Sequence, residues 1–121
     1  MTYQPLTKLS EDELMFKDAV FGYAKDMIGP KVSEMDESGI LDKSLIPGLF
    51  EMGLMGIEIP ESYGGAGASF FTAILAIESL SRIDPSVAVV VDVQNTLVNN
   101  AILRWGSDAQ KEKYLHKMCG E

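Results

Sequence analysis

Apolar residues recur every three or four positions through most of this 121-residue chain, and this spacing constrains the fold more than any other feature. Side chains at that spacing share one face of an α-helix, whereas a half-buried strand needs strict alternation. We expect five helices, without repeats or low-complexity tracts. The sequence therefore predicts an all-α fold, with an N-terminal extension over residues 1–9 and one helical domain over residues 10–121. An apolar content of 46% is enough for a single packed core.

Start and stop signals bound the first two expected helices. Ser10 is followed three residues later by Glu13, which is the pattern of a capping box, and the acidic residues of this first turn favour a helix N-terminus. This helix should end or kink at Gly29–Pro30. A shorter helix is expected over residues 44–52, with Gly53 as its C-cap. The apolar face expected for the first helix consists of Phe16, Val20, Tyr23, Ala24 and Met27.

A glycine-rich stretch follows these two helices. Residues 54–60 are typical of extended chain, and the Tyr-Gly-Gly-Ala-Gly sequence of residues 63–67 is incompatible with a regular helix. A phosphate-binding loop would need a Lys-Ser or Lys-Thr pair that this stretch lacks, and the Glu61 carboxylate would repel an anion. The glycines therefore favour a structural turn.

Three further helices are expected after the glycine-rich stretch. One begins at Ser69 and should be largely buried through a stripe formed by Phe70, Ile74, Ile77 and Leu80. The next follows Asp84–Pro85 and covers residues 86–105, because its helical spacing continues over a length that no ordinary strand reaches, despite a β-branched first half. A last amphipathic helix is expected over residues 108–118.

Charge and cysteine usage exclude several classes of function. The formal net charge of −8 and the pI near 4.5 argue against binding to nucleic acid or to an anionic membrane surface. Cys119, the lone cysteine, has no partner in the chain for a disulfide, which fits a reducing compartment. Asp84, Pro85, Ser86 and Asp92 interrupt the longest apolar stretches, so we expect none to span a bilayer. The first residues resemble neither a signal peptide nor a transit peptide.

Few titratable side chains suggest chemistry. His116 has no second histidine or cysteine pair at metal-ligand spacing, so we expect no metal site and treat it as a surface residue. Cys119 would be a nucleophile if His116 acted as its base, but no third group orients the pair. Glu78 and Asp92 lie on apolar segments, where an acid–base role competes with simple exposure or pairing with Arg82 or Arg104, and we favour the second interpretation.

A group of neutral polar residues interrupts the apolar helix expected over residues 86–105. Buried amides must be hydrogen-bonded. Such groups orient ligands in apolar pockets, and they equally cross-link helices inside cores, so spacing leaves both interpretations open. The group consists of Gln94, Asn95, Thr96, Asn99 and Asn100.

Residues 53–67, Gly-Leu-Met-Gly-Ile-Glu-Ile-Pro-Glu-Ser-Tyr-Gly-Gly-Ala-Gly, resemble the signature stretch of the acyl-CoA dehydrogenase family. Three further motifs follow in the family's order and spacing: Ile-Glu-Ser-Leu-Ser-Arg-Ile-Asp-Pro-Ser at 77–86, Gln-Asn-Thr-Leu at 94–97 and Trp-Gly-Ser-Asp-Ala-Gln-Lys at 105–111. The resemblance covers nearly all of residues 9–121. It is strongest to the short/branched-chain (2-methyl-branched) members, with straight short-chain and isovaleryl types as alternatives.

The resemblance implies how this domain would work. Family members join such an N-terminal helical domain to a middle β domain and a C-terminal helical domain, and hold FAD between the latter two and a neighbouring subunit. The glutamate that abstracts the acyl α-proton, while the flavin takes the β-hydride, belongs to the C-terminal region. We therefore expect no catalytic, cofactor-binding or metal-ligating residue in this chain, and we expect the isolated chain to be inactive and to retain no FAD.

The same resemblance implies partners and a place in metabolism. It predicts an acyl-CoA substrate, a homotetramer and an electron-transfer flavoprotein as electron acceptor, in fatty acid or branched-chain amino acid catabolism. The compartment would be the mitochondrial matrix in a eukaryote and the cytoplasm in a bacterium. The alternative from another class is a free-standing helical binding or assembly module that keeps the fold without the chemistry.

Part of the acyl-pocket wall is assigned to this domain by the resemblance. By this resemblance, the wall residues in this chain are Val89, Val90, Gln94 and Leu97. Burial of methylenes against such an apolar wall gives a chain-length discrimination of a few kcal/mol at most. The sequence departs from the family pattern where His116 replaces a frequent Pro, and where Val90 stands in place of a bulkier residue of some branched-chain members, which leaves the acyl preference open.

Overall fold

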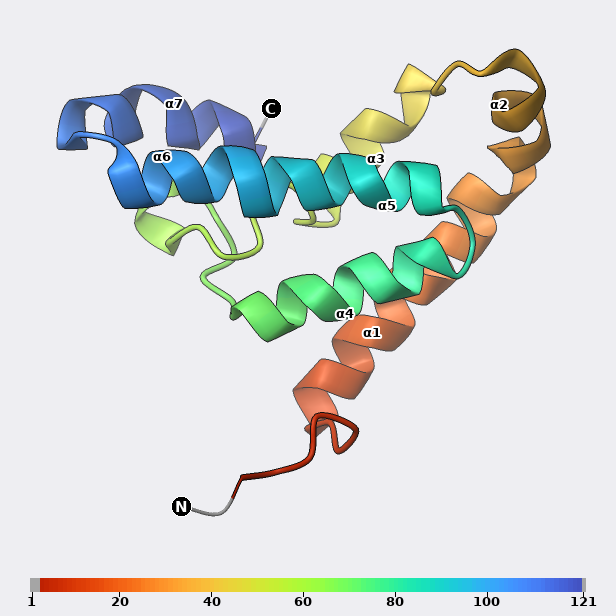
Figure 1. Cartoon of the computed structure of the whole chain (residues 1–121), viewed down its shortest axis with the longest axis horizontal. Coiled ribbons are helices and arrows are strands. Elements are labelled where there is room, and N and C mark those ends of the chain that lie inside the picture. Colours follow the sequence, from red (N-terminus) through yellow and green to blue (C-terminus); the bar gives the residue numbers. More distant parts are fainter. Residues whose placement is uncertain (1–2, 121) are drawn as a thin grey trace.

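The computed structural model of the chain describes residues 3–120, and within them the secondary structure is helical, without a strand (Figure 1). Adjacent helical segments join into five runs, as the sequence predicts. Figure 1 shows α4 (Phe70–Ser81) side by side and antiparallel with the run from α5 (Pro85–Asp92) to α6 (Asn100–Trp105). Helix α1 (Glu11–Tyr23) crosses α4, and α7 (Asp108–Gly120) folds back along α6. The domain is therefore a layered helical bundle.

The first run bends without ending. Helix α1, Glu11–Tyr23, opens with the predicted capping box, in which the backbone N of Ser10 donates to Glu13 Oε2 at 2.8 Å and the N of Glu13 donates to Ser10 Oγ at 3.2 Å. A π segment, Ala24–Ile28, and a 3₁₀ turn, Gly29–Lys31, carry the chain into α2, Val32–Ser38. Gly29–Pro30 thus kinks the run, as predicted.

The π segment corrects the predicted apolar face of this run. Val20, Ala24 and Ile28 are fully buried, whereas Met27 is 53% exposed. A π segment, with bonds from residue i to i+5, holds more residues per turn than an α-helix. Ile28 rather than Met27 therefore comes into line with Val20 and Ala24.

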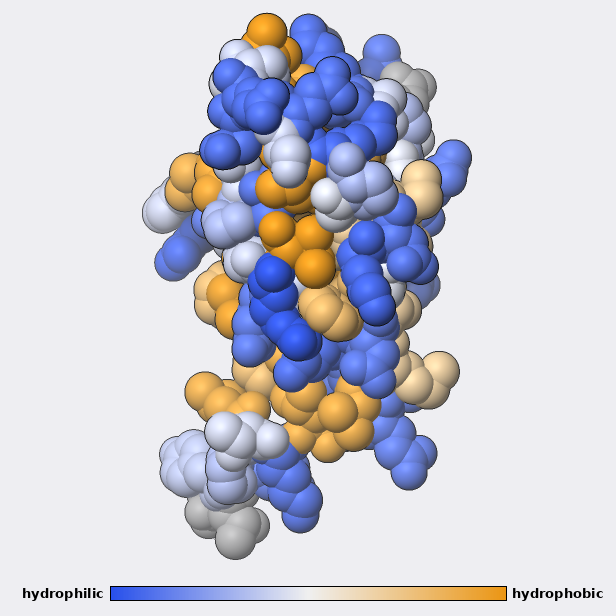
Figure 2. Space-filling view, turned by 90° about the vertical axis from the view of Figure 1, so that its right-hand side faces the viewer, coloured by the Kyte–Doolittle hydropathy of each residue, from blue (hydrophilic) through white to orange (hydrophobic). Residues whose placement is uncertain are grey.

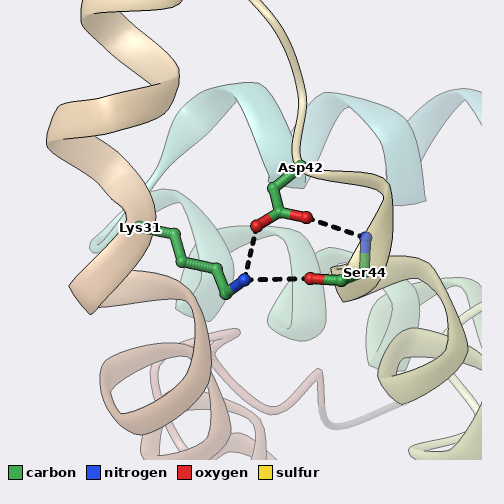
Figure 3. Close-up of polar contacts among 3 residues, drawn as sticks. All are labelled: Lys31, Asp42 and Ser44. Carbon is green, nitrogen blue, oxygen red and sulfur yellow. Dashed lines mark hydrogen bonds and ion pairs between the residues drawn. The ribbon is translucent and has the colours of Figure 1, made fainter.

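A polar link connects α2 to the next run (Figure 3). Lys31 Nζ, at the start of α2, contacts Asp42 Oδ2 and donates to Ser44 Oγ at 2.9 Å, while the backbone N of Ser44 donates to Asp42 Oδ1 at 2.9 Å. The Lys31 ammonium and the Ser44 donors lower the pKa of Asp42 to about 2. A 3₁₀ turn, Lys43–Leu45, then leads into α3, Ile46–Glu51, and Gly53 follows with φ 71°, close to the predicted bounds.

Residues 54–69 form a compact loop rather than extended chain. The backbone N atoms of Ala66, Gly67 and Ala68 donate to the carbonyls of Gly56, Ile59 and Ile57 at 2.8–2.9 Å. The loop is thus closed by its own backbone, and it contains a 3₁₀ turn, Glu61–Tyr63. The glycine-rich part is a structural turn, as the sequence favours.

Helix α4, Phe70–Ser81, begins directly after Ser69, close to the predicted start, and it buries Leu80 of the predicted stripe but not Phe70 or Ile74. Phe70 and Ile74 are 54% and 39% exposed. The buried side chains are smaller on average: Ala73, Leu75, Ala76, Ser79 and Leu80. Alanines let α4 pack closely on α1 and α5, so a stripe chosen for its large side chains misjudges which face is covered.

The fourth run is one continuous helix built from α5, Pro85–Asp92, a π segment, Val93–Asn99, and α6, Asn100–Trp105. Asp84 caps it by accepting a hydrogen bond from the N of Ser86 at 3.0 Å. Its 21 residues, with a mean hydropathy of 1.2 in the most apolar window, are long and apolar enough to cross a membrane, so the expectation that no stretch reaches that length is wrong. Here the helix packs against α4 and carries buried amides, as core helices do.

Two apolar clusters hold the runs together. Helix α7, Asp108–Gly120, is attached by a small cluster of Ile59, Leu115 and Cys119. The main cluster joins the first four runs and the 54–69 loop, and its buried members are Val20, Ala24, Ile28, Leu45, Leu49, Leu54, Met55, Ile57, Ala73, Ala76, Leu80, Val87, Ala88 and Val91. The α5–α6 run therefore has one side in the core and leaves its other side uncovered.

Candidate functional site

The helix over residues 85–105 carries two lines of side chains on opposite sides. A buried line repeats every four residues: Val87, Val91, Asn95 and Asn99. Side chains two residues further on are exposed, with exposed fractions of 56% for Val89, 39% for Val93 and 63% for Leu97. Because each residue turns an α-helix by about 100°, an offset of two residues places this exposed line away from the core. We call Val89, Val93 and Leu97 the apolar ridge.

The π segment keeps both lines nearly straight. In an α-helix four residues overshoot one turn by about 40°, so the three steps from Val87 to Asn99 would displace the line by about 120°. The segment Val93–Asn99 has bonds from residue i to i+5 and winds more slowly, which offsets part of this drift. The ridge therefore stays opposite the buried line over two full repeats.

Asn95 fixes the buried side of this helix to the 54–69 loop. Its Oδ1 accepts a hydrogen bond from the backbone N of Ile57 at 2.9 Å, and its Nδ2 donates to the carbonyl of Leu54 at 2.7 Å. The same Nδ2 donates to the carbonyl of Val91, one turn earlier in the helix, at 2.8 Å. This 1%-exposed side chain thus meets two loop groups and one helix group.

Three more amides of the same helix bind neighbouring elements. Asn99 Nδ2 donates to the carbonyl of Met55 at 2.7 Å, and Asn100 Nδ2 donates to Glu58 Oε2 at 2.9 Å. Gln94 Nε2 donates to the carbonyl of Met118 in α7 at 2.9 Å. Within residues 3–120 every buried side-chain polar atom has a partner. The sequence leaves open whether these amides orient a ligand or cross-link elements inside the core. For Asn95 and Asn99 their bonding partners show that they cross-link the core.

The four predicted wall residues fall into three places. Val89 and Leu97 lie on the apolar ridge with Val93, which the sequence reasoning missed although it stands four residues from each. Val90 is half-buried and lines a hollow of about 360 Å³ beside α2, with Val32 and Asp84 among its neighbours. Gln94 binds α7. The structure brings two of the four together on one surface, and their contact with an acyl chain stays a prediction.

Further apolar surface lies beyond the ridge. The exposed line continues through Ala101 to Trp105, which is 79% exposed. Trp105 and Tyr114 line a hollow of about 410 Å³ between α6 and α7. Figure 2 shows that apolar residues also reach the surface, among hydrophilic ones, on the face at the right of Figure 1. Contiguous exposed apolar surface on a small domain marks a site of contact with a partner or ligand.

A family model described as "Acyl-CoA dehydrogenase, N-terminal domain" matches residues 10–121. The chain belongs to the acyl-CoA dehydrogenase family. It is 53% identical over 96% of its length to a probable short/branched chain specific acyl-CoA dehydrogenase of Dictyostelium discoideum, and 50% identical over 97% to the mitochondrial short/branched chain specific acyl-CoA dehydrogenase of Bos taurus. It spans 28% and 27% of the lengths of these two relatives.

The solved structures agree with the family assignment. The structure of butyryl-CoA dehydrogenase from Megasphaera elsdenii superposes with a TM-score of 0.86 at 32% identity, covering 98% of this chain and 31% of that one. This likeness confirms that the five-helix domain has the acyl-CoA dehydrogenase N-terminal fold. The family that the sequence resembles is confirmed by the family model and by the two relatives.

The 54–69 loop of this acyl-CoA dehydrogenase domain does not fit the phosphates of FAD. Phosphate-binding loops offer free backbone N–H groups. Here the N atoms of Gly65, Ala66 and Gly67 already donate to the carbonyls of Pro60, Gly56 and Ile59. The exposed Glu61 carboxylate adds repulsion of an anion. No group of three metal-ligating side chains is present among residues 3–120.

The remaining titratable candidates have structural surroundings. Cys119 is 6% exposed, and burial raises the pKa of its thiol, which disfavours a nucleophilic role. The Nε2 atom of His116 lies 3.4 Å from Oε1 of Glu112, and the His116 ring packs edge-on against the ring of Tyr63, with the ring centroids 5.7 Å apart. Asp92 accepts a hydrogen bond from Thr96 Oγ1 at 2.9 Å.

Arg82 and Arg104, the arginines considered as partners for Glu78 and Asp92, stack on aromatic rings. The guanidinium of Arg82 lies 3.9 Å from the centroid of the Phe21 ring, and that of Arg104 lies 5.3 Å from the Trp105 centroid. Glu78 is thus an exposed carboxylate and Asp92 a half-buried one bonded within its own helix, which favours the structural interpretation of both.

Proposed function

We propose that this chain is the acyl-pocket domain of an FAD-dependent acyl-CoA dehydrogenase that oxidises short or 2-methyl-branched acyl-CoA to the 2,3-enoyl-CoA. The observation that carries the proposal is the exposed apolar ridge on the α5–α6 run, in a chain about half identical to two short/branched chain specific enzymes. In the whole enzyme the ridge faces the acyl tail. The domain's part in the reaction is to bind the tail, not to move protons or electrons.

The ridge recognises the tail by excluding water from it. Each methylene buried against valine and leucine side chains stabilises the complex by about 0.8 kcal/mol. Val89 and Val93 are β-branched and therefore stiff, so with Leu97 they offer a wall that tolerates a tail of fitting width and penalises one that is too wide. Val90 and Gln94 belong to the proposed pocket through the family resemblance, and lie on the adjoining side of the helix.

The proposal includes the partners that the family resemblance implies. FAD is held by the rest of the enzyme, in keeping with the closed backbone of the 54–69 loop. The enzyme is a homotetramer that passes electrons to an electron-transfer flavoprotein. It works in fatty acid or branched-chain amino acid catabolism, in the mitochondrial matrix in a eukaryote or in the cytoplasm of a bacterium. The mitochondrial relative of Bos taurus supports the first location.

Purification of the full-length protein tests this function. We expect a yellow protein with one flavin per subunit that reduces an electron-transfer flavoprotein with acyl-CoA substrates. Across straight-chain, 2-methyl-branched and isovaleryl-type substrates, kcat/KM should be highest for a short or 2-methyl-branched acyl group. A flavin-free protein that oxidises none of these would favour the alternative of a helical binding or assembly module.

A further inference from the structure

We propose that Asn95 and Asn99 are positioning residues for acyl recognition, which hold the π segment Val93–Asn99 and thereby align the apolar ridge. The inference rests on the proposed function, because it takes the ridge as part of the acyl pocket. Neither amide reaches the exposed side of the helix, since both are 1% exposed. They act on the tail through the backbone that carries Val93 and Leu97.

Both amides lie inside the π segment and bind the same loop. Asn95 meets the backbone of Leu54 and Ile57, and Asn99 meets the carbonyl of Met55. The loop they hold is itself rigid, because its backbone closes on itself through three hydrogen bonds between residues 56–59 and 66–68. Two anchors four residues apart on a rigid partner fix both the rotation and the winding of the helix between them.

Two side-chain donors bind backbone carbonyls at the point where α-helical winding changes to π-helical winding. Asn95 Nδ2 donates to the carbonyl of Val91 at 2.8 Å, and Thr96 Oγ1 donates to the carbonyl of Asp92 at 2.8 Å. These are the last two carbonyls before the π segment. Where the winding of a helix changes, the regular backbone hydrogen bonds are interrupted, and a side-chain donor can then bind the carbonyl oxygen. Asn95 therefore supports the π segment from within the helix as well as from the loop.

Loss of the anchors would let the segment relax toward α-helical winding. The step from Val93 to Leu97 would then overshoot one turn by about 40°, as the α-helical step from Val89 to Val93 already does, so Leu97 would turn out of line with Val89. The ridge would no longer present one straight wall. Discrimination between acyl tails should fall, while the reacting end of the substrate, which other domains hold, keeps its surroundings.

The test replaces Asn99 in the full-length holoenzyme and measures KM and kcat across acyl-CoA chain lengths. With Asn99→Ala, we expect the ratio of kcat/KM between the best and the poorest tail to shrink at least about three-fold, mainly through KM. Asn100→Ala is the matched control, because it removes a hydrogen bond to the same loop, at Glu58, from just outside the π segment. That variant should keep the wild-type ratio.

Backbone amide hydrogen exchange supplies a second readout that does not depend on turnover. Asn99→Ala should speed exchange over residues 93–99 more than over residues 86–92. If Asn99→Ala does not fold, Asn99→Ser keeps a hydroxyl donor and should show both effects at reduced size. An unchanged ratio and unchanged exchange in a folded variant would overturn the positioning role.

A parallel variant separates this inference from the proposed function. Val93→Phe alters the ridge directly and should change the chain-length profile. If Val93→Phe changes it and Asn99→Ala does not, the ridge lines the pocket and the positioning role is wrong. If neither changes it while the wild-type enzyme discriminates between tails, the ridge itself is not part of the acyl pocket.

Discussion

Gly56 of the 54–69 loop lies so close to Cys119 of α7 that a Cβ on the glycine would come 2.6 Å from the cysteine Sγ and 2.8 Å from its Cβ. Real Cβ atoms do not approach other heavy atoms this closely. Gly56 is buried, and Cys119 belongs to the cluster that holds α7 to the rest of the domain. The contact therefore joins the signature stretch of the family to the last helix.

Replacing Gly56 with alanine should destabilise the domain. The added methyl overpacks the contact with Cys119, which costs about 1–3 kcal/mol of unfolding free energy. Gly22→Ala is the matched control, because a Cβ there meets nothing within 4 Å and the residue lies in α1. It should be neutral or stabilising, by up to about 1 kcal/mol. Urea unfolding of the two variants checks this, and equal stability of Gly56→Ala and wild type would contradict the packing.

The Cys119 thiol should react slowly in the folded chain. It is 6% exposed, and burial raises its pKa, so less thiolate is present near pH 8 than for a free cysteine. An aromatic disulfide reagent should modify it slowly until denaturant is added, and Cys119→Ala should remove the signal. Immediate modification of the native protein would show that α7 is loosely attached.

Acid should weaken the link between α2 and α3. The pKa of Asp42 is lowered from 3.8 to about 2, chiefly by its hydrogen bond to Lys31, so its contribution to stability is complete above pH 3.8 and is lost as the pH falls through about 2. Asp42→Asn should flatten the fall in stability over this window. Thermal unfolding of both proteins at several pH values measures it, and parallel curves would show that the carboxylate does not contribute.

Local signals in the sequence predict where the helices begin and end. Ser10, Ser69 and Asp84 cap helices in the structure because capping depends on neighbours two or three residues away. Burial depends on distant contacts, so the faces are predicted less well. The π segments shift the buried line to Ile28, and the small residues of α4 turn Ile74 outward.

In the candidate site too, some residues can be predicted from the sequence, whereas others depend on contacts between distant parts of the chain. The family resemblance predicts Val89 and Leu97, both of which are exposed on the ridge. Val93 is missed, because the resemblance does not assign it to the wall and the π segment that aligns it with Val89 and Leu97 is not visible in the residue types. The pairing of Asn95 with Ile57 joins residues 38 positions apart, which no local pattern specifies.

The 121-residue chain alone should neither retain FAD nor oxidise any acyl-CoA. The backbone N–H groups of its glycine-rich loop are already bonded, and the ridge and Trp105 leave apolar surface exposed. We expect purified chain without flavin absorbance, with a mainly helical circular dichroism spectrum and with fluorescence from a bound apolar dye. Stoichiometric flavin in the purified chain would mean that the cofactor site lies here.

The acyl-CoA chain-length profile of the Val89→Phe full-length enzyme tests the ridge most directly. A phenyl ring on the ridge should narrow the slot, where overpacking costs about 1–3 kcal/mol, and lower kcat/KM for long tails, with short-tail turnover and flavin content close to wild type. The sequence predicts the same effect at Val90, and Val90→Phe, beside the α2 hollow, is the companion variant. An equal fall for all chain lengths, with flavin retained, would contradict the acyl wall and make Val89 a packing residue.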